Sequence, residues 1–310
     1  MSRKGEKMNF LRKKLRRLRD LIRFLKLFKV RKDLHLVTNK NILAKISEDD
    51  VYKKYEKEYS ELIARGVDMS LESAPCNKIW ICWLQGEENA PELVRACINS
   101  IRCNFSTHEV IILSEKNIST YIQFPEYIEK KWKEKKFGAA HFSDLLRTAL
   151  LCQYGGIWID ATVLCTSNDI PTAITESPLF VYQIIDLIRW DREPIVASSW
   201  FISSYSNHPI LLLTRALLYK YWETNEYTEN YFLFHIFFAI ATRRYKDEWK
   251  KVPVYTNQSP HTLQFELGEP YNESRWNEIT RMSVFHKLNH HNDYTNTGQS
   301  FYYYIIKTFL

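Results

Sequence analysis

The 310-residue sequence predicts an α/β fold in which a mostly parallel central sheet carries helices on both faces. From residue 78 to about residue 160, short apolar runs bounded by polar residues alternate with longer segments of helical periodicity. Alternating strands and helices are typical of a parallel sheet. The composition, 45% hydrophobic and 25% charged, is that of a globular protein.

Residues 1–32 are predicted to form a basic amphipathic helix. Apolar residues recur there at spacings of three or four, and Lys and Arg fill the other faces: Leu11, Leu15, Leu18, Ile22, Leu25 and Phe28. Such a helix suits an anionic membrane surface. A solvated tail and a partner-binding helix are the alternatives.

The positive charge is concentrated in this leader. Residues 1–32 hold 14 Lys and Arg against Glu6 and Asp20, a balance of +12 within a total of +7, so the remainder sums to −5. A body of this charge does not resemble a nucleic-acid-binding surface. We therefore expect no nucleic-acid partner.

Residues 33–75 are predicted to be a helical spacer, and residues 76–310 the main domain. No apolar run reaches the roughly 18 residues of a membrane span, and no secretory signal is recognisable. We expect a cytoplasmic protein held peripherally on the inner face of the cell membrane. The six cysteines form no CxxC pair and are expected to be reduced, packed thiols.

The first elements of the main domain follow from apolar runs. Residues 79–84 (IWICWL) predict a strand, Pro91 opens a helix that continues to Ile101, and residues 110–113 predict a second strand. Polar helical material follows over residues 121–136.

The next helix, residues 139–154, ends at Gly155-Gly156, a typical stop before the strand at 157–160. Beyond it the pattern loosens. We expect strands at 179–183, 199–203 and 282–288, helices at 208–222 and 231–245, and an aromatic tail at 301–310.

Polar residues at strand ends are the first candidates for chemistry, because ligands of open α/β sheets bind beyond the carboxyl ends of the strands. Asp160 follows three large apolar residues and can hold a metal or a hydroxyl, or can cap a turn. Asp144 and Arg147, three residues apart, share one helix face. They are either a surface ion pair or a pair that hydrogen-bonds sugar hydroxyls.

Residues 142–147 (FSDLLR) and 150–163 (LLCQYGGIWIDATV) resemble the Ser-Asp-x-x-Arg, Tyr-Gly-Gly and Asp-x-Asp core of the glycosyltransferase sugar-binding superfamily. Within it, glycosyltransferase family 32 is similar, and the capsular polysaccharide synthesis proteins are the closer match. Residues 78–86 (KIWICWLQG), Ala90-Pro91 and residues 231–235 (YFLFH) also resemble the capsular group.

The resemblance implies a GT-A-like nucleotide-sugar-binding fold whose Asp motif binds the donor, expected to be a UDP-sugar, through Mn²⁺ or Mg²⁺. Asp144 and Arg147 would hold the donor sugar, and Trp83 would contact the nucleotide base. Ser143 and Thr162 are also expected to bind the donor. Asp160 takes the first acidic position, near the ribose, sugar and metal.

Thr162 stands where the motif usually has its direct metal ligand. A hydroxyl is a poor substitute for a carboxylate on a hard cation, so the standard metal site is in doubt. Either Asp160 binds the metal with help, for which His286 is the candidate, or basic side chains stabilise the leaving group. Lys287 would then meet phosphate directly. His235, on an apolar helix, is expected to be a structural histidine.

These expectations favour a hexosyl-type transferase. It would move a sugar, with retention, from a nucleotide-diphosphate donor to a capsular or surface polysaccharide intermediate, expected to be lipid-linked. One alternative is a sugar-phosphate transferase. Another is a non-catalytic GT-A-like scaffold of a membrane glycan-assembly complex. No catalytic nucleophile is identified from the sequence.

Overall fold

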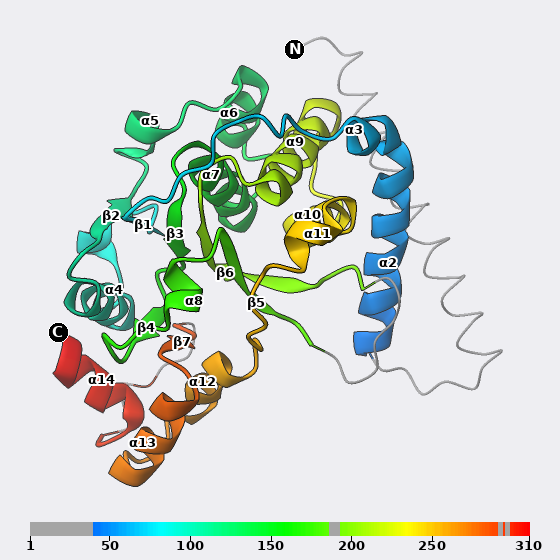
Figure 1. Ribbon diagram of the computed structural model, residues 1–310. Coiled ribbons are helices and arrows are strands. Elements are labelled where there is room, and N and C mark those ends of the chain that lie inside the picture. The colour runs from blue at the N-terminus through cyan, green and yellow to red at the C-terminus, as the bar shows by residue number, and fades with distance from the viewer. Residues whose placement is uncertain (1–39, 186–192, 291–293, 295–297) are drawn as a thin grey trace. The chain divides into compact units, whose positions relative to one another are not determined.

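The computed structural model describes residues 40–185, 193–290, 294 and 298–310. Two compact units follow one another along the chain, one ending at Asp50 and the other spanning Val51–Leu310. The second unit contains the sheets and is an α/β fold, as expected (Figure 1). The predicted leader helix lies outside the described residues. The expected boundaries at residues 32 and 75 stay predictions.

In the part of the chain that the structure describes, two helices precede the first strand, and strands and helices follow in mixed order. In chain order they are α2 (Lys40–Glu58), α3 (Ser60–Arg65), β1 (Lys78–Cys82), η1 (Glu87–Asn89), α4 (Glu92–Asn104), β2 (Glu109–Leu113), α5 (Ile118–Tyr121), α6 (Glu126–Lys133), α7 (Ala139–Gln153), β3 (Gly156–Ile159), β4 (Val163–Cys165), α8 (Thr172–Thr175), β5 (Leu179–Gln183), β6 (Ala197–Ser204), α9 (Pro209–Thr224), α10 (Leu233–Arg244), α11 (Lys246–Trp249), η2 (Ser259–His261), α12 (Thr262–Glu266), α13 (Glu273–Met282), β7 (Phe285–Lys287) and α14 (Phe301–Phe309).

The central sheet has five strands in the order β2-β1-β3-β6-β5. Strands β2, β1 and β3 are mutually parallel, and β6 is antiparallel to both of its neighbours. Four strands therefore share one direction, which confirms the mostly parallel sheet. The carboxyl ends of β1 and β3 meet at one edge of this sheet.

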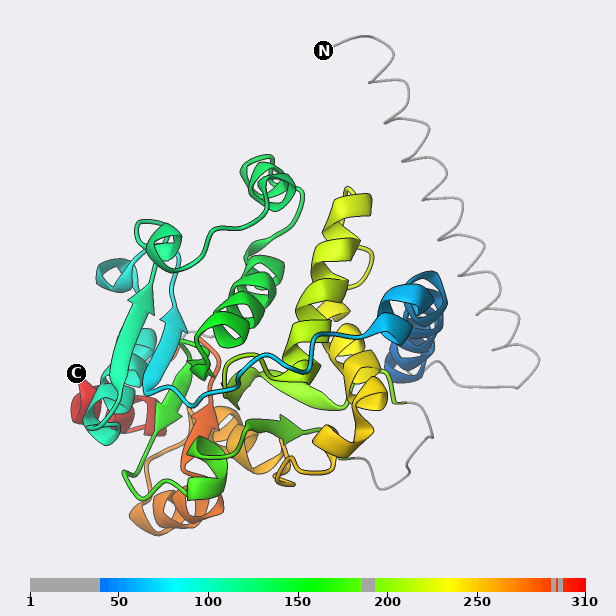
Figure 2. The same ribbon diagram turned by 45° about the horizontal axis from the view of Figure 1, so that its top comes forward.

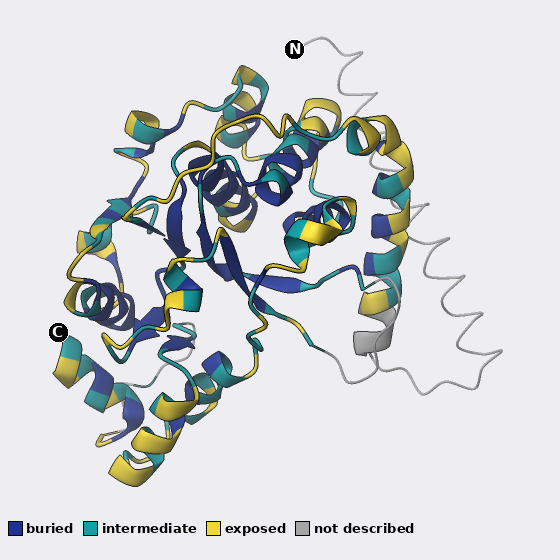
Figure 3. Cartoon of the chain, in the orientation of Figure 1, coloured by how far each residue is buried: buried dark blue, intermediate teal, exposed yellow. Residues whose placement is uncertain are grey.

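The sheet separates two apolar cores because successive strand residues face opposite sides. Trp80, Trp158 and Ile202 face a core that includes residues of α7, α9 and α10. Ile79 and Ile157, one position earlier on their strands, face a second core that includes α4. Figure 3 shows the central strands as almost wholly buried. Helices thus cover both faces, as the alternation predicted.

A second, two-stranded sheet joins β4 to β7 in antiparallel register. Strand β4 was not expected. The predicted strand at 282–288 is shorter than expected, since Met282 ends α13 and β7 begins at Phe285. The C-terminal helix α14 packs against α4, and both views place the two side by side (Figures 1 and 2).

The turn from α7 into β3 requires glycine, as its sequence indicated. Gly155 and Gly156 have φ angles of 72° and 93°, which side chains rarely adopt. A Cβ atom on Gly156 would lie 2.4 Å from the carbonyl oxygen of Lys78. The indole N–H of Trp80 donates to the Gly155 carbonyl, 2.9 Å away. This turn brings β3 against β1.

The structure also bears on the expected helix at 121–136, on the cysteines and on membrane-spanning helices. The helical stretch at 121–136 is divided into α5 and α6, because Pro125 precedes α6. All six cysteines are free, as expected, but Cys103 is exposed rather than packed. Among the described residues, no helix is long and apolar enough to cross a bilayer.

Candidate functional site

A pocket of about 510 Å³ opens where β1 and β3 end, at the edge of the sheet at which ligands of α/β proteins bind. The residues predicted to bind a sugar donor all line it. They are Trp83, Ser143, Asp144, Arg147, Asp160, Thr162 and Lys287. Side chains that are up to 204 positions apart in the sequence therefore meet in one cavity.

Asp160 emerges from the end of β3 in a fixed orientation. Its backbone N–H donates to the carbonyl of Trp200, 2.8 Å away, and its carbonyl accepts from Val163 at 3.0 Å. Its carboxylate Oδ1 accepts from the indole N–H of Trp158, 2.9 Å away. Strand and turn together therefore hold the carboxylate at the rim of the sheet.

Arg147 lies between two carboxylates. Its Nη1 is 3.2 Å from Oδ1 of Asp144, and its Nη2 is 3.4 Å from Oδ1 of Asp160. Nη1 also donates to the carbonyl of Ser199 at 3.0 Å. The guanidinium lies over the ring of Trp158, 5.1 Å from its centroid. Its Nε is buried without a hydrogen-bond partner. The alternative of a surface ion pair is wrong, since Arg147 and Asp144 are buried.

Asp144 has an unusual protonation equilibrium because of its surroundings. Burial raises the pKa of its carboxyl to about 7, against the opposing effect of Arg147. A carboxyl that titrates near neutrality is common at functional sites, where it exchanges hydrogen bonds with a ligand. In this pocket it accepts hydrogen bonds when ionised and donates one when protonated.

Trp83 directly follows β1 and forms another part of the wall. Its backbone N–H donates to the carbonyl of Leu113 at 2.9 Å, which extends the pairing of β1 with β2. Its ring meets that of His290 edge to face, with centroids 5.4 Å apart. The indole N–H is buried without a partner. A flat ring with an unused donor suits a planar heteroaromatic ligand such as a base.

Lys287 and His286 lie on opposite faces of β7. The Lys287 ammonium lines the pocket, 3.4 Å from Oδ2 of Asp160, and donates to the hydroxyl of Thr162. His286 is fully buried on the other face, with Nε2 3.4 Å from the hydroxyl of Thr166, and is not among the residues that line the pocket. The structure therefore separates His286 from Asp160, its expected partner in a metal site.

The polar residues of the pocket are a poor fit for a resident divalent cation. Both oxygens of Asp160 already face cationic groups, and Thr162 accepts from Lys287. Within the described ranges, no three His, Cys, Asp or Glu side chains are grouped as metal ligands. Magnesium and manganese favour several oxygen ligands, carboxylates above all. At the position of the motif the pocket offers one carboxylate, Asp160, beside two positive charges, and the other carboxylate of the pocket, Asp144, is paired with Arg147.

His235 lines the pocket, which the sequence did not lead us to expect. Its Nδ1 is buried without a hydrogen-bond partner. Burial, with Arg147 nearby, lowers the pKa of its imidazole to about 3, so the ring is neutral near pH 7. Because the residues around His235 in α10 are mostly apolar, the sequence indicated a core position rather than one in the pocket wall. The one available signal was the resemblance of residues 231–235 to the capsular group.

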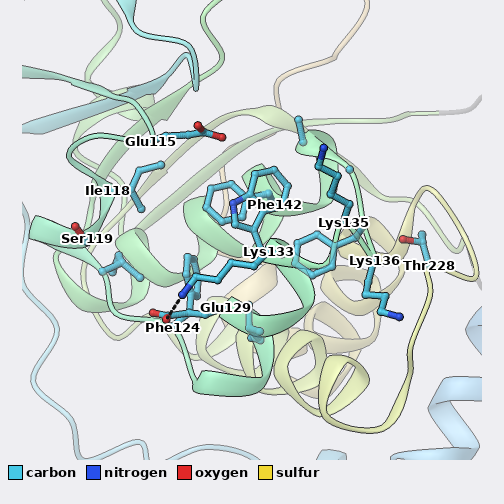
Figure 4. Close-up of a pocket in the computed structure, with 16 residues that line it drawn as sticks. Glu115, Ile118, Ser119, Phe124, Glu129, Lys133, Lys135, Lys136, Phe142 and Thr228 are labelled. Carbon is cyan, nitrogen blue, oxygen red and sulfur yellow. Dashed lines mark ion pairs between the residues drawn. The ribbon is translucent and has the colours of Figure 1, made fainter. Parts of the chain in front are cut away.

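A second, larger hollow of about 960 Å³ lies beside the start of α7 (Figure 4). Its floor is aromatic and aliphatic, formed by Phe124, Trp132, Phe137, Phe142, Ile118 and Ile122. Lys133, Lys135 and Lys136 stand at its rim, and Lys133 is 4.0 Å from Glu129. In α7, Phe142 lines this hollow and the adjacent Ser143 lines the pocket at the ends of β1 and β3.

Comparison with known proteins shows one curated relative, the O-glycosyltransferase braB of Annulohypoxylon truncatum. It is 29% identical over 157 residues, which are 47% of this chain and 37% of that protein. This chain thus matches little more than a third of the relative's length. Among solved structures, the PaToxG glycosyltransferase aligns with a TM-score of 0.40 and 17% identity, over 78% of this chain and 95% of that one.

The most extensive similarity is to a protein family. Residues 31–306 match the family described as capsular polysaccharide synthesis protein. The match includes every residue that lines the pocket at the ends of β1 and β3. The chain therefore belongs to the capsular polysaccharide synthesis protein family.

Proposed function

We propose that the protein is a glycosyltransferase that moves a hexosyl group from a nucleotide-diphosphate sugar to a capsular or surface polysaccharide intermediate. The observation that carries the proposal is that the seven candidate donor-binding residues, chosen from the sequence, line a single pocket. Membership of the capsular family and the partial similarity to an O-glycosyltransferase support it.

Each part of a nucleotide sugar has a chemical counterpart in this pocket. Trp83 offers an aromatic face and an N–H to a base, for which uracil is our first candidate. Lys287 offers positive charge to the diphosphate. Asp144 offers an acceptor to sugar hydroxyls and Arg147 an unused donor, and the Nδ1 of His235 donates or accepts according to its tautomer.

We propose that transfer retains the anomeric configuration. The carboxylates that line the described pocket are Asp144 and Asp160, and both are paired with Arg147. Neither is a free nucleophile. The bond from the sugar C1 to the phosphate oxygen breaks as a bond to the acceptor oxygen forms on the same face. The acceptor proton passes to the departing phosphate. Arg147 and Lys287 stabilise the negative charge that develops.

The acceptor is proposed to be lipid-linked, and the apolar hollow supports an isoprenoid phosphate as its carrier. Its aromatic floor suits a hydrocarbon chain, and the lysine rim suits a phosphate. Lys135 is exposed, and no described ion pair involves it. The hollow and the donor pocket meet the same N-terminal turns of α7, which would place the glycan end of the acceptor near the donor.

The lipid proposal is tested with geranylgeranyl phosphate, geranylgeraniol and inorganic phosphate as probes, by competition and direct binding. We expect the lipid phosphate to bind most tightly, and Lys135→Glu to weaken it severalfold while Lys307→Glu has no effect. Equal binding of alcohol and phosphate would contradict the role of the lysines. Absence of lipid binding would contradict the lipid carrier.

The donor proposal is tested by thermal unfolding with a panel of UDP-, GDP- and CMP-sugars. A ligand that binds the folded state raises its apparent stability. We expect a UDP-sugar to stabilise the wild type, and Asp160→Ala to lose the effect. Asp169→Ala, which removes an exposed carboxylate outside the pocket, should keep it. If no donor stabilises the protein, a non-catalytic scaffold becomes the better proposal.

A sugar-phosphate transferase is distinguished by its product. Mass spectrometry of a reaction with donor labelled in the phosphate next to the sugar separates the two reactions. Transfer of the sugar alone leaves that phosphate on the nucleotide. Label in the glycan product would contradict glycosyl transfer.

A further inference from the structure

The segment between β3 and β4 differs from a metal-binding Asp-x-Asp motif at the last position of the motif. Where the motif's second carboxylate is expected, Thr162 presents a hydroxyl. The Lys287 ammonium from β7 contacts both this hydroxyl and Oδ2 of Asp160. A positive side chain therefore bridges the first and last positions of the motif.

The pairing of β4 with β7 fixes this bridge. Lys287 is paired with Val163, and the N–H of Leu288 donates to the carbonyl of Thr162 at 2.9 Å. Backbone hydrogen bonds on both sides of Lys287 thus hold its Cα beside the motif. The ammonium is delivered by the sheet register rather than by a mobile loop.

A divalent cation at this position would have to displace Lys287. Oδ1 of Asp160 accepts from Trp158 and lies 3.4 Å from Arg147, and Oδ2 faces Lys287. A second carboxylate that would offset the added charge is missing from the described pocket wall, since Asp144 is already paired with Arg147. Repulsion from two fixed cations therefore opposes metal entry.

We propose that the Lys287 ammonium serves in place of a divalent cation, so that the donor diphosphate binds without metal. An ammonium has three N–H donors. Asp160 and Thr162 engage two of them, which leaves one for a phosphate oxygen. Lys287 lines the pocket and is 22% exposed, so that oxygen can reach it. This inference rests on the proposed glycosyltransferase function.

The first test measures UDP binding by calorimetry in EDTA and in excess Mn²⁺. We expect wild-type affinities within about twofold of each other in the two conditions. Lys287→Met, which keeps the length of the side chain, should lose at least tenfold in EDTA. Lys287→Arg should recover part of it, and Lys251→Met, which removes an exposed lysine paired with Glu248, should match the wild type. Circular dichroism checks that each variant is folded.

A second test replaces the Lys287 ammonium with a carboxylate that can bind a metal ion. Thr162→Asp combined with Lys287→Ala restores a second carboxylate and removes the ammonium. We expect this double variant to bind UDP only when Mn²⁺ is present. Failure of Mn²⁺ to restore UDP binding to a folded double variant would contradict the idea that ammonium and metal share one position.

The outcomes separate this inference from the proposed function. UDP binding by the wild type only with Mn²⁺ would overturn the inference and leave the glycosyltransferase in place. Tight EDTA-resistant binding by Lys287→Met would also overturn it. If no UDP, GDP or CMP compound binds in either condition, both proposals fail together.

Discussion

Trp158 and Asp160 lie two positions apart on one face of the chain, and the indole N–H of the first donates to Oδ1 of the second at 2.9 Å. The indole ring also lies beneath the guanidinium of Arg147. One buried tryptophan therefore orients both a carboxylate and a cation of the candidate site. Its removal should affect ligand binding as well as packing.

Trp158→Phe is expected to weaken donor binding about tenfold, because a hydrogen bond to a charged group contributes about 1.5–3 kcal/mol. Trp80→Phe is the matched control. Trp80 is equally buried on β1, but its N–H donates to Gly155. Both variants should lower the melting temperature, whereas only Trp158→Phe should change the donor Kd. Equal donor affinities would contradict a positioning role for Trp158.

Arg147→Lys is expected to destabilise the fold by about 2–4 kcal/mol, because a lysine cannot serve Asp144, Asp160 and Ser199 at once and a buried carboxylate is left poorly compensated. Urea unfolding measures the change. Arg102→Lys, at the partly exposed pair with Glu87, should stay within about 0.5 kcal/mol. If the two variants lose similar amounts of unfolding free energy, the buried contacts of Arg147 do not stabilise the fold more than an exposed ion pair does.

The pKa of Asp144 predicts a pH-dependent stability. Burial raises this pKa to about 7 in the folded protein from 3.8, so the folded state binds the proton more tightly than the unfolded state. The resulting stabilisation is complete below about pH 4 and is lost as the pH rises through about 7. Its slope is at most roughly 1.4 kcal/mol per pH unit.

Asp144→Asn tests this, because asparagine does not titrate. Between pH 5 and 8 the free energy of unfolding of the wild type should fall relative to that of the variant. Arg147 and Asp160 face Asp144 in both proteins. His141 and His235, whose pKa values are lowered from 6.5 to about 4 and about 3, titrate within this window in the unfolded state, but equally in both proteins, so their contribution cancels in the difference. A constant difference would mean that Arg147 keeps Asp144 ionised throughout.

Gly156→Ala is expected to cost at least about 2 kcal/mol, because a side chain at a φ of 93° is strained and its Cβ would lie 2.4 Å from the Lys78 carbonyl. Gly298→Ala is the control, since a Cβ there meets nothing within 4 Å. Chemical denaturation should show a loss for Gly156→Ala and a change within about 0.5 kcal/mol for Gly298→Ala. A tolerated Gly156→Ala would contradict the close approach of β3 to β1.

Deletion of residues 1–32 is expected to release the protein from anionic membranes while sparing donor binding. The wild type should sediment with vesicles that contain phosphatidylglycerol, less so in high salt, and weakly with neutral phosphatidylcholine vesicles. The truncated protein should stay in the supernatant with both. If truncation abolishes donor binding as well, the leader is part of the fold rather than an anchor.

The sequence predicted those parts of the fold that are locally encoded. The apolar runs predicted β1, β2, β3 and β5 to within one or two residues, since each is long enough to show a pattern. Strand β4 has three residues and its partner β7 begins 120 positions later, so no local pattern marks it. The C-terminal limit of α13 depends on where this pairing begins, which is why Met282 was placed in a strand.

The residues of the candidate site were likewise predictable only where a local sequence pattern marks them. Ser143, Asp144, Arg147 and Asp160 were found because their motif is contiguous and the helix and strand between them are regular. The choice between His286 and Lys287 depended on which face of β7 meets the pocket. Only the register with β4 decides that. His235 was assigned to the core because α10 is apolar on most sides.

Lys287 is carried by a strand that the chain reaches only after the central sheet and most of its helices are complete. Chains are synthesised from the N-terminus, and domains begin to fold as they emerge from the ribosome. The apolar cores around β1 and β3 can therefore form while the pocket still lacks its ammonium. If Lys287 binds the diphosphate, a nascent or prematurely terminated chain that stops before β7 binds nucleotide sugars at least tenfold more weakly, and synthesis of this late strand raises the affinity for the donor.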